Sequence, residues 1–270
     1  MKKSGRPWWP TMCRACRRWQ GRMLCSTCLT PDIMAQLRCQ RCALPLTALH
    51  PQGDALCPQC ADDPPQFDHA VAALDYASPW RQLIAHLKFK EDPAMAQALG
   101  ALLLEQILKR WELKAPGQRK TLMRLRAGAP TLVLPVPLSA ARLCERGYNQ
   151  AALVAEHIAS ALSLPMRTDI LLRPRDTARL MSLDADEREL QIRGAFTVPP
   201  AQAALIRGRH VAVVDDVLTT GATLNEIART LWVAGAREVS VWVVARTPAP
   251  AERTRRVTHW QDTQPLGMRA

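Results

Sequence analysis

The sequence predicts an α/β fold in which a small cysteine-rich N-terminal module precedes a doubly wound, mostly parallel sheet. Four Cys-x-x-Cys pairs occupy the first 60 residues. Apolar runs of strand length then alternate with helical patterns, and one run ends in two acids before a small-residue loop and a helix. Strands that alternate with helices through right-handed crossovers form a mostly parallel sheet with helices on both faces.

Each element of the sheet domain follows from its local pattern. The strands are short apolar runs rich in β-branched residues, and the helices carry apolar residues three and four positions apart. Pro93 precedes the second helix, where proline is tolerated at the start. The expected strands are residues 69–76, 131–134, 207–215 and 238–245, and the expected helices are residues 80–89, 94–111, 149–162 and 223–233.

The chain is expected to divide into three parts. We expect residues 1–62 to form a double zinc-ribbon module, residues 66–247 the sheet domain, and residues 248–270 an irregular tail. A cysteine-rich segment of about 60 residues with few large aliphatic side chains cannot bury enough surface to fold alone, so bound metal has to supply the folding energy. The tail is polar, contains proline and shows no sustained period, which is typical of irregular structure.

Residues 211–223 carry the strongest indication of function. Asp215 and Asp216 end the apolar run, and a Thr-Thr-Gly-Ala-Thr turn leads into a helix. Backbone N–H groups and the positive end of the helix dipole hold a phosphate at such a turn, and Gly221 lets the backbone approach closely. Carboxylates beside the turn accept hydrogen bonds from sugar hydroxyls. A phosphate next to vicinal hydroxyls describes a ribose 5-phosphate.

Eight of the nine cysteines form four pairs with two intervening residues. Two such pairs complete a tetrahedral site of four sulfurs, so eight sulfurs predict two structural zinc ions. We expect sequential pairing, although the spacing also allows a cross-braced one. Disulfides, iron–sulfur clusters and a redox pair are weaker alternatives, because the pairs repeat regularly and no secretory signal is evident. The predicted zinc ligands are Cys13, Cys16, Cys25, Cys28, Cys39, Cys42, Cys57 and Cys60.

The formal net charge is +12, and basic residues are concentrated near the N-terminus. Arg14, Arg17, Arg18 and Arg22 surround Trp19. Basic side chains interleaved with aromatic ones hold the backbone of single-stranded nucleic acid and stack on its bases, although a basic composition also serves solubility alone. No apolar run reaches the ~18 residues of a membrane helix. We therefore expect a cytoplasmic protein without membrane insertion.

The acidic strand and its loop resemble the phosphoribosyl diphosphate (PRPP) binding motif of type I phosphoribosyltransferases. Further segments extend the resemblance: Pro-Val-Pro-Leu at 135–138, Glu-Arg-Gly-Tyr-Asn-Gln at 145–150, Arg-Gly-Ala-Phe at 193–196, Asp-Tyr-Ala at 75–77 and Leu-Lys-Phe at 87–89. Together with the cysteine pairs, this order is similar to the ComF competence-protein family, in particular its GntX-like members. The resemblance implies a zinc module fused to a type I phosphoribosyltransferase-like domain. It also implies a role in DNA uptake or utilisation, with single-stranded DNA and DNA-uptake or recombination proteins as candidate partners.

The resemblance assigns roles to individual residues. The two acids hold the ribose hydroxyls, the loop holds the 5-phosphate, and Mg²⁺ binds mainly through oxygens of PRPP and water. The implied PRPP-binding residues are Asp215, Asp216, Val217, Leu218, Thr219, Thr220, Gly221, Ala222 and Thr223. The implied pyrophosphate loop is Pro135, Val136 and Pro137 with Arg142 and Arg146, whose guanidinium groups match phosphate oxygens.

The sequence departs from the family pattern between residues 171 and 196. Leu180 stands where the family has glutamine and Gln191 where it has asparagine, although Thr177 and Leu183 remain. An aliphatic side chain cannot donate to a substrate, so PRPP binding is a safer prediction than turnover. Two functions stay open: Mg²⁺-dependent displacement of pyrophosphate from PRPP, and a non-catalytic PRPP sensor that binds single-stranded DNA. The sequence identifies neither the acceptor nor a catalytic residue.

Overall fold

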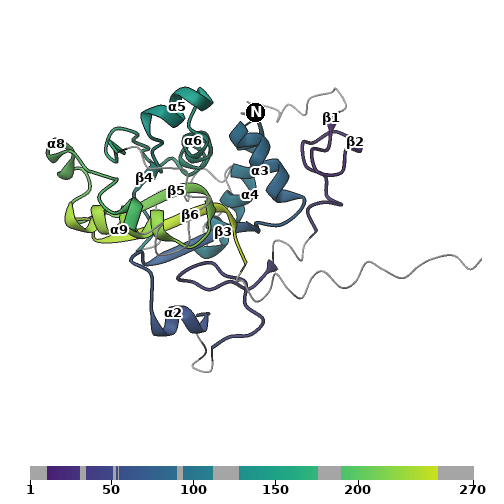
Figure 1. The fold of residues 1–270 in the computed structure, drawn as a ribbon. Helices are drawn as coiled ribbons and strands as arrows, with labels where there is room; N and C mark the ends of the chain where they lie inside the picture. Colours follow the sequence, from purple (N-terminus) through teal and green to yellow (C-terminus); the bar gives the residue numbers. More distant parts are fainter. Residues whose placement is uncertain are drawn as a thin grey trace, which may run out of the picture.

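The central feature of the protein is a sheet of four parallel strands in the order β3, β6, β5, β4 (Figure 1). These strands are β3 (His69–Asp75), β4 (Leu132–Pro135), β5 (His210–Leu218) and β6 (Glu238–Arg246). The computed structural model describes residues 11–30, 35–50, 53, 55–89, 94–111, 128–175 and 190–248. Within these residues the predicted parallel sheet is confirmed.

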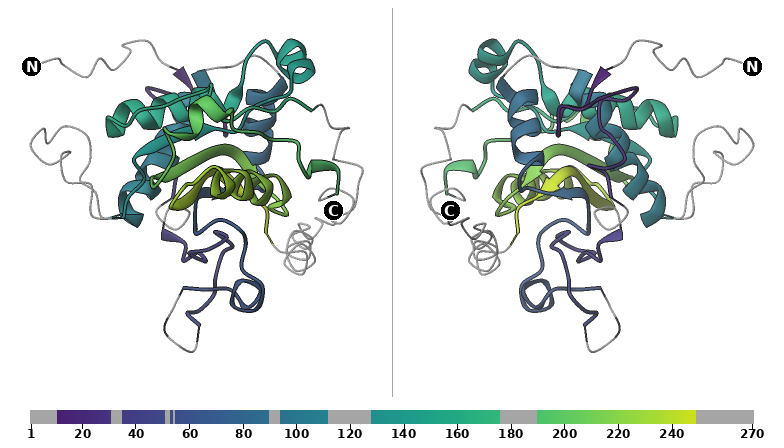
Figure 2. Two further views of the ribbon diagram at one scale, coloured as in Figure 1. Left: turned by 90° about the vertical axis from the view of Figure 1, so that its left-hand side faces the viewer. Right: turned by 90° about the vertical axis from the view of Figure 1, so that its right-hand side faces the viewer.

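Helices cover both faces of the sheet (Figures 1 and 2). The helices α4 (Ala94–Arg110) and α6 (Gln150–Leu162) lie on one face, and α9 (Ala222–Val233) lies on the other. Successive side chains of a strand point to opposite faces. Accordingly, Val214 of β5 is buried in the core with α4 and α6, and Val213 is buried in the core with α9. This is the doubly wound arrangement that the sequence predicts.

Several shorter elements complete the described chain. The helix α3 (Trp80–Phe89) packs against α4, and α5 (Ala140–Arg146) precedes α6. The other elements are α2 (Pro58–Asp62), α8 (Pro200–Ala203) and the antiparallel pair β1 (Thr11–Met12) and β2 (Trp19–Gln20). The four predicted helices are observed as α3, α4, α6 and α9, each within one residue of its predicted limits.

The strand β5 is shifted toward the C-terminus relative to its predicted limits, residues 207–215. It begins at His210 and continues to Leu218, because β6 is long enough to pair Asp215 with Val243 and Leu218 with Arg246. The two acids therefore lie inside a paired strand and do not follow it. Since adjacent strand residues point to different sides, Asp215 and Asp216 have different neighbours.

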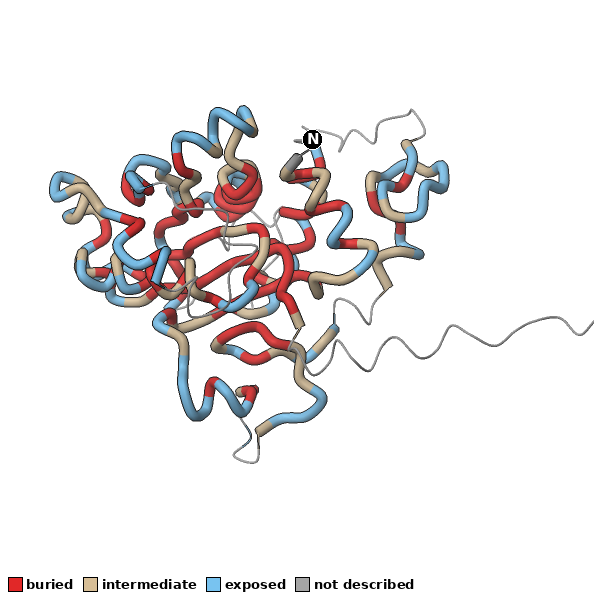
Figure 3. Tube along the Cα trace, viewed as in Figure 1, coloured by how far each residue is buried: buried red, intermediate tan, exposed pale blue. Residues whose placement is uncertain are grey.

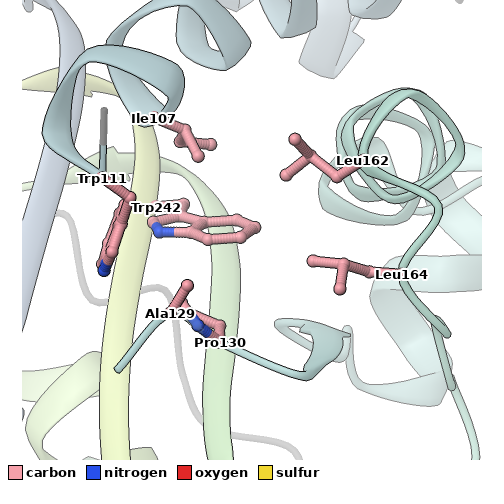
Figure 4. A pocket seen from close by; sticks show the side chains of 7 residues that line it. All are labelled: Ile107, Trp111, Ala129, Pro130, Leu162, Leu164 and Trp242. Atoms are coloured by element: carbon pink, nitrogen blue, oxygen red, sulfur yellow. The ribbon is translucent and has the colours of Figure 1, made fainter. Parts of the chain in front are cut away.

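The core between α4, α6 and β6 contains a cluster of aromatic and aliphatic side chains. Trp242 of β6 is 1% exposed, and its ring meets that of Trp111 edge to face at a centroid distance of 6.0 Å. Figure 4 shows Trp242 at the centre of a small hollow lined entirely by apolar residues, among them Leu162 and Leu164. With no polar lining to orient a ligand, the hollow belongs to the core.

The two cysteine-rich segments lie on different sides of the sheet (Figures 1 and 2). Leu24 of the first segment is buried in the core with α3, α4 and α6, whereas Ala43 of the second is buried in the core with α9. Figure 3 shows buried residues in both segments. The division into residues 1–62, 66–247 and 248–270 stays a prediction, and almost the whole tail lies outside the described residues.

Candidate functional site

The predicted phosphate loop follows β5 at the carboxyl edge of the sheet, where open α/β sheets bind ligands. Thr219 and Thr220 are exposed, and Gly221 caps the N-terminus of α9 with φ of +93°. A backbone angle in this region favours glycine. The first amides of α9 have no partner within the helix, so the exposed loop offers backbone donors to an anion.

The Asp216 carboxylate is buried and held at both oxygens. Asp216 as a whole is 3% exposed. The ammonium of Lys88, from α3, lies 2.8 Å from Oδ1, and Nε2 of Gln150, from α6, donates to Oδ2 over 2.8 Å. Burial acts to lower the pKa of Lys88. The negative charge of Asp216 and, to a smaller extent, that of Asp215 outweigh burial, so the net shift of the Lys88 pKa is upward. Lys88 is therefore charged. Through these two contacts Asp216 connects β5 with α3 and α6.

Asp215 has a different environment. Its Oδ1 accepts a hydrogen bond from the backbone N–H of Asp216 over 2.8 Å. Among the residues that the structure describes, its Oδ2 has no hydrogen-bond partner. Burial and the neighbouring charge of Asp216 raise the pKa of Asp215 to about 7. Asp215 therefore exchanges a proton near neutral pH and presents the acceptor oxygen that a ligand can use.

Lys88 and Gln150 are site residues to which local sequence patterns give no role. Both lie in segments of the family resemblance, residues 87–89 and 145–150. Only the packing of α3 and α6 brings their side chains to Asp216. One signal in the sequence could have identified Lys88: it stands between Leu87 and Phe89. If such a helix packs on the core, the lysine charge has to be paired with an acid.

The predicted pyrophosphate loop follows β4, the strand beside β5. The N–H of Val136 donates to the carbonyl of Val214, and the carbonyl of Val136 accepts from Nδ2 of Asn149, both over 2.9 Å. Pro135 ends β4, and Pro137 is half-buried. Arg142 and Arg146 lie in α5, and both are half-buried. The structure brings this loop to the same edge of the sheet as the acids, while its role in binding pyrophosphate stays a prediction.

The segment that departs from the family pattern is described only at its ends. Thr177, Leu180 and Leu183 lie outside the described residues, and Gln191 is exposed. Arg173 is buried, with its guanidinium carbon 5.4 Å from the centre of the Phe196 ring. Its charge acts to lower the pKa of Asp215, against the net upward shift. Arg173 thus contributes positive potential to the acid pair.

The cysteines form two quartets with the sequential pairing. The sulfurs of Cys13, Cys16, Cys25 and Cys28 lie within 4.8 Å of one another, as do those of Cys39, Cys42, Cys57 and Cys60. A Zn–S bond of about 2.3 Å places tetrahedral sulfurs roughly 3.8 Å apart. The sulfurs lie 4.0 Å apart for Cys13 and Cys28, 3.7 Å for Cys16 and Cys25, and 3.6 Å for Cys42 and Cys57. Two structural metal sites therefore fit these residues, and Cys144 stands apart and exposed.

The predicted nucleic-acid surface lies on the first quartet. Trp19 is 69% exposed. The surrounding arginines are exposed as well: Arg14, Arg17, Arg18 and Arg22. A further group of basic residues, Lys114, Arg119, Lys120, Arg124 and Arg126, lies outside the described residues. Trp19 and these arginines are thus exposed on a segment that one metal ion would hold in place.

The fold and the sequence define a phosphoribosyltransferase-like domain: residues 149–263 match the phosphoribosyl transferase domain family. The DNA utilization protein YhgH of Shigella flexneri is 33% identical over 88% of this chain and 98% of its own length. Competence protein F of Haemophilus influenzae is 33% identical over 70% of this chain and 78% of its own. The chain therefore belongs to the family of these DNA utilization and competence proteins, as the sequence predicts.

Among solved structures, the chain is similar to the glutamine PRPP amidotransferase of B. subtilis. It is 20% identical, covers 59% of this chain and 30% of its own, and superposes with a TM-score of 0.35. None of the helices described here is both long and apolar enough to cross a membrane.

Proposed function

We propose that the protein binds PRPP together with Mg²⁺ and acts in DNA uptake or utilisation. The observation that carries the proposal is the acid pair of β5, which is followed directly by the exposed Thr219 and Thr220 and by Gly221 at the N-terminus of α9. Backbone amides of the loop hold the 5-phosphate, and Oδ2 of Asp215 accepts from a ribose hydroxyl. Arg142 and Arg146 face the pyrophosphate, and Mg²⁺ is held mainly by oxygens of PRPP and water.

The proposed reaction is displacement of pyrophosphate from C1 of PRPP by an acceptor. The protein contributes mainly by positioning the ribose and stabilising the leaving pyrophosphate. One observation favours binding without turnover as the second candidate: Asp216 is already held by Lys88 and Gln150, which leaves Asp215 as the acid with an available oxygen. Pyrophosphate release that requires an added acceptor would identify an enzyme, whereas PRPP binding with no release under any acceptor would identify a sensor.

We predict that PRPP with Mg²⁺ stabilises the protein and that Asp215→Asn/Asp216→Asn abolishes this effect. A ligand at one hundred times its dissociation constant adds roughly 2.7 kcal/mol to the free energy of unfolding. The measurement is the shift in melting temperature for each variant relative to its own unliganded form. Because ionised Asp215 is the better acceptor and its pKa is raised to about 7, affinity should rise with pH across that value.

The control for this experiment is Asp62→Asn, which changes an acid in α2 that is exposed and remote from β5. This variant should show the full shift with PRPP. Asp215→Asn alone should lose most of it. Equal shifts in the wild type and in the double variant would remove the proposed ribose role of the acids.

We also propose that single-stranded DNA binds to the exposed arginines and Trp19 around the first quartet. The support is the exposure of these side chains and the DNA utilization and competence functions in the names of the relatives. Arginine contacts to phosphates release counterions, and an aromatic side chain stacks on a base for ~1–3 kcal/mol. DNA-uptake or recombination proteins are the proposed protein partners, and the cytoplasm is the proposed location.

The test of DNA binding uses point variants, because Leu24 and Ala43 are part of the main cores and deleting residues 1–62 would expose these cores. Trp19→Ala should weaken binding of a labelled oligonucleotide about tenfold, in line with the lost stacking energy. Arg17→Ala/Arg18→Ala/Arg22→Ala should also reduce the dependence of affinity on salt.

A matched charge control removes three other exposed arginines, at 207, 209 and 237. This control variant should keep most of the affinity for the oligonucleotide. Equal losses in the two triple variants would mean that net charge alone binds DNA, and that the surface around Trp19 is not the site.

A further inference from the structure

Arg246, the last residue of β6, has a buried side chain whose hydrogen bonds all go to backbone carbonyls. The residue is 8% exposed. Its Nε donates to the carbonyl of Cys42 over 2.9 Å. Its Nη1 donates to the carbonyls of Leu218 over 3.0 Å and Thr247 over 2.8 Å, and to that of Thr219. One guanidinium thus contacts four carbonyl oxygens.

These carbonyls belong to segments with different predicted tasks. Cys42 is a ligand of the second quartet, whereas Leu218 ends β5 and Thr219 begins the phosphate loop. The carbonyl of Leu218 also accepts from the N–H of Thr247 over 3.0 Å. The side chain of Arg246 is therefore a direct connection between the second quartet and the loop.

An arginine suits this connection for physical reasons. Its planar guanidinium presents five N–H donors in fixed directions, whereas lysine offers a single ammonium. A buried cation is costly unless it is hydrogen-bonded and its charge is offset. Four thiolates around a divalent metal keep a net negative charge, which would offset the charge of Arg246 beside Cys42.

The second quartet is itself anchored to the sheet. The N–H of Ala70, in β3, donates to the carbonyl of Gln40 over 3.0 Å. Arg41 donates to the carbonyl of Asp68 over 2.9 Å, and Arg38 pairs with Asp75 over 2.9 Å. The quartet is therefore fixed against the sheet, and the hydrogen bonds of Arg246 connect it to the start of the loop.

We infer that Arg246 is a positioning residue, which fixes the start of the phosphate loop against the second cysteine quartet so that the metal-filled quartet forms part of the frame of the binding site. The inference rests on the proposed function for the identity of the ligand. It depends only on the contacts of Arg246 for the position of the loop.

The test compares the full-length wild type with Arg246→Met, Arg246→Lys and the control Arg41→Met. Arg41 lies next to Cys42 and contacts Asp68 but has no described contact with the loop. Amide hydrogen exchange of residues 218–223, zinc content and affinity for PRPP with Mg²⁺ are measured for each protein. Exchange reports the local opening of the loop separately from global unfolding.

Both Arg246 variants should keep two zinc ions, show about tenfold faster exchange in the loop and bind PRPP about tenfold more weakly. Arg41→Met should change neither quantity by more than about twofold, because the hydrogen bond from Ala70 to Gln40 and the pair of Arg38 with Asp75 still anchor the quartet. Wild-type exchange in the loop of both Arg246 variants would overturn the inference, and so would equal effects of Arg41→Met and Arg246→Met. If the wild type itself binds no PRPP, the proposed function fails, and the exchange comparison still decides the role of Arg246.

Discussion

Removal of zinc from the two cysteine quartets is expected to unfold the N-terminal segments and to destabilise the sheet domain. Structural zinc contributes about 10–16 kcal/mol in small zinc-binding peptides near neutral pH. The second quartet has a small core of its own, consisting of cysteines and three leucines, so little apolar burial would replace the metal. Metal analysis should find two zinc ions per chain. Chelation of the zinc should abolish the cooperative thermal unfolding transition of the full-length protein.

Single substitutions separate the two sites. Cys16→Ser and Cys57→Ser each remove one ligand from a different quartet and should each reduce the content to one zinc. Cys144→Ser changes an exposed cysteine outside both quartets and should retain two. A wild-type content of one zinc, or of iron, would contradict the assignment.

The second large effect is expected for Lys88→Met. Lys88 and Asp216 are 22% and 5% exposed at their side chains and lie 2.8 Å apart. Removing one partner of a buried ion pair leaves the other charge unpaired, which costs about 3–5 kcal/mol. The free energy of unfolding, measured in denaturant, should fall by this amount. Lys88→Met should also loosen the attachment of α3 to β5.

The control for Lys88→Met is the same substitution at Lys109. Lys109 pairs with Glu105 over 3.0 Å, but both side chains are about half exposed, and such pairs contribute roughly 0.3–0.5 kcal/mol. Lys88→Met/Asp216→Asn should recover more than about half of the lost stability, because no buried charge is then left unpaired. Additive losses in the double variant would show that the two residues do not act as a pair.

The main features of the fold were predictable from local patterns. Helix 223–233 is observed as α9 at Ala222–Val233, with Leu224, Ile227 and Leu231 buried as their spacing predicts. The spacing of the cysteines predicted four-sulfur sites, and the sequential pairing is the one observed. These features depend on periodicity and on residues close in sequence, which a single sequence displays directly.

The environment of the acid pair was not predictable in the same way. Lys88 and Gln150 reach Asp216 only because α3 and α6 pack on one face of the sheet. Likewise, Arg246 meets Cys42 only through the fold. Side-chain partners far apart in sequence leave no local periodic signal, so the sequence assigned the same role to two acids whose surroundings differ.

By itself, the sequence determined the class of fold, the two cysteine quartets and the family, and it located the loop for which we propose phosphate binding, because each depends on local spacing or on ordered motifs. The tertiary structure alone decided where the quartets sit and which groups hold the acids. It placed Leu24 in one core and Ala43 in the other, and it left Asp215 rather than Asp216 with an available oxygen. The physical reason is that burial and pairing of charges are properties of the packed chain, set by contacts between segments that the sequence keeps apart.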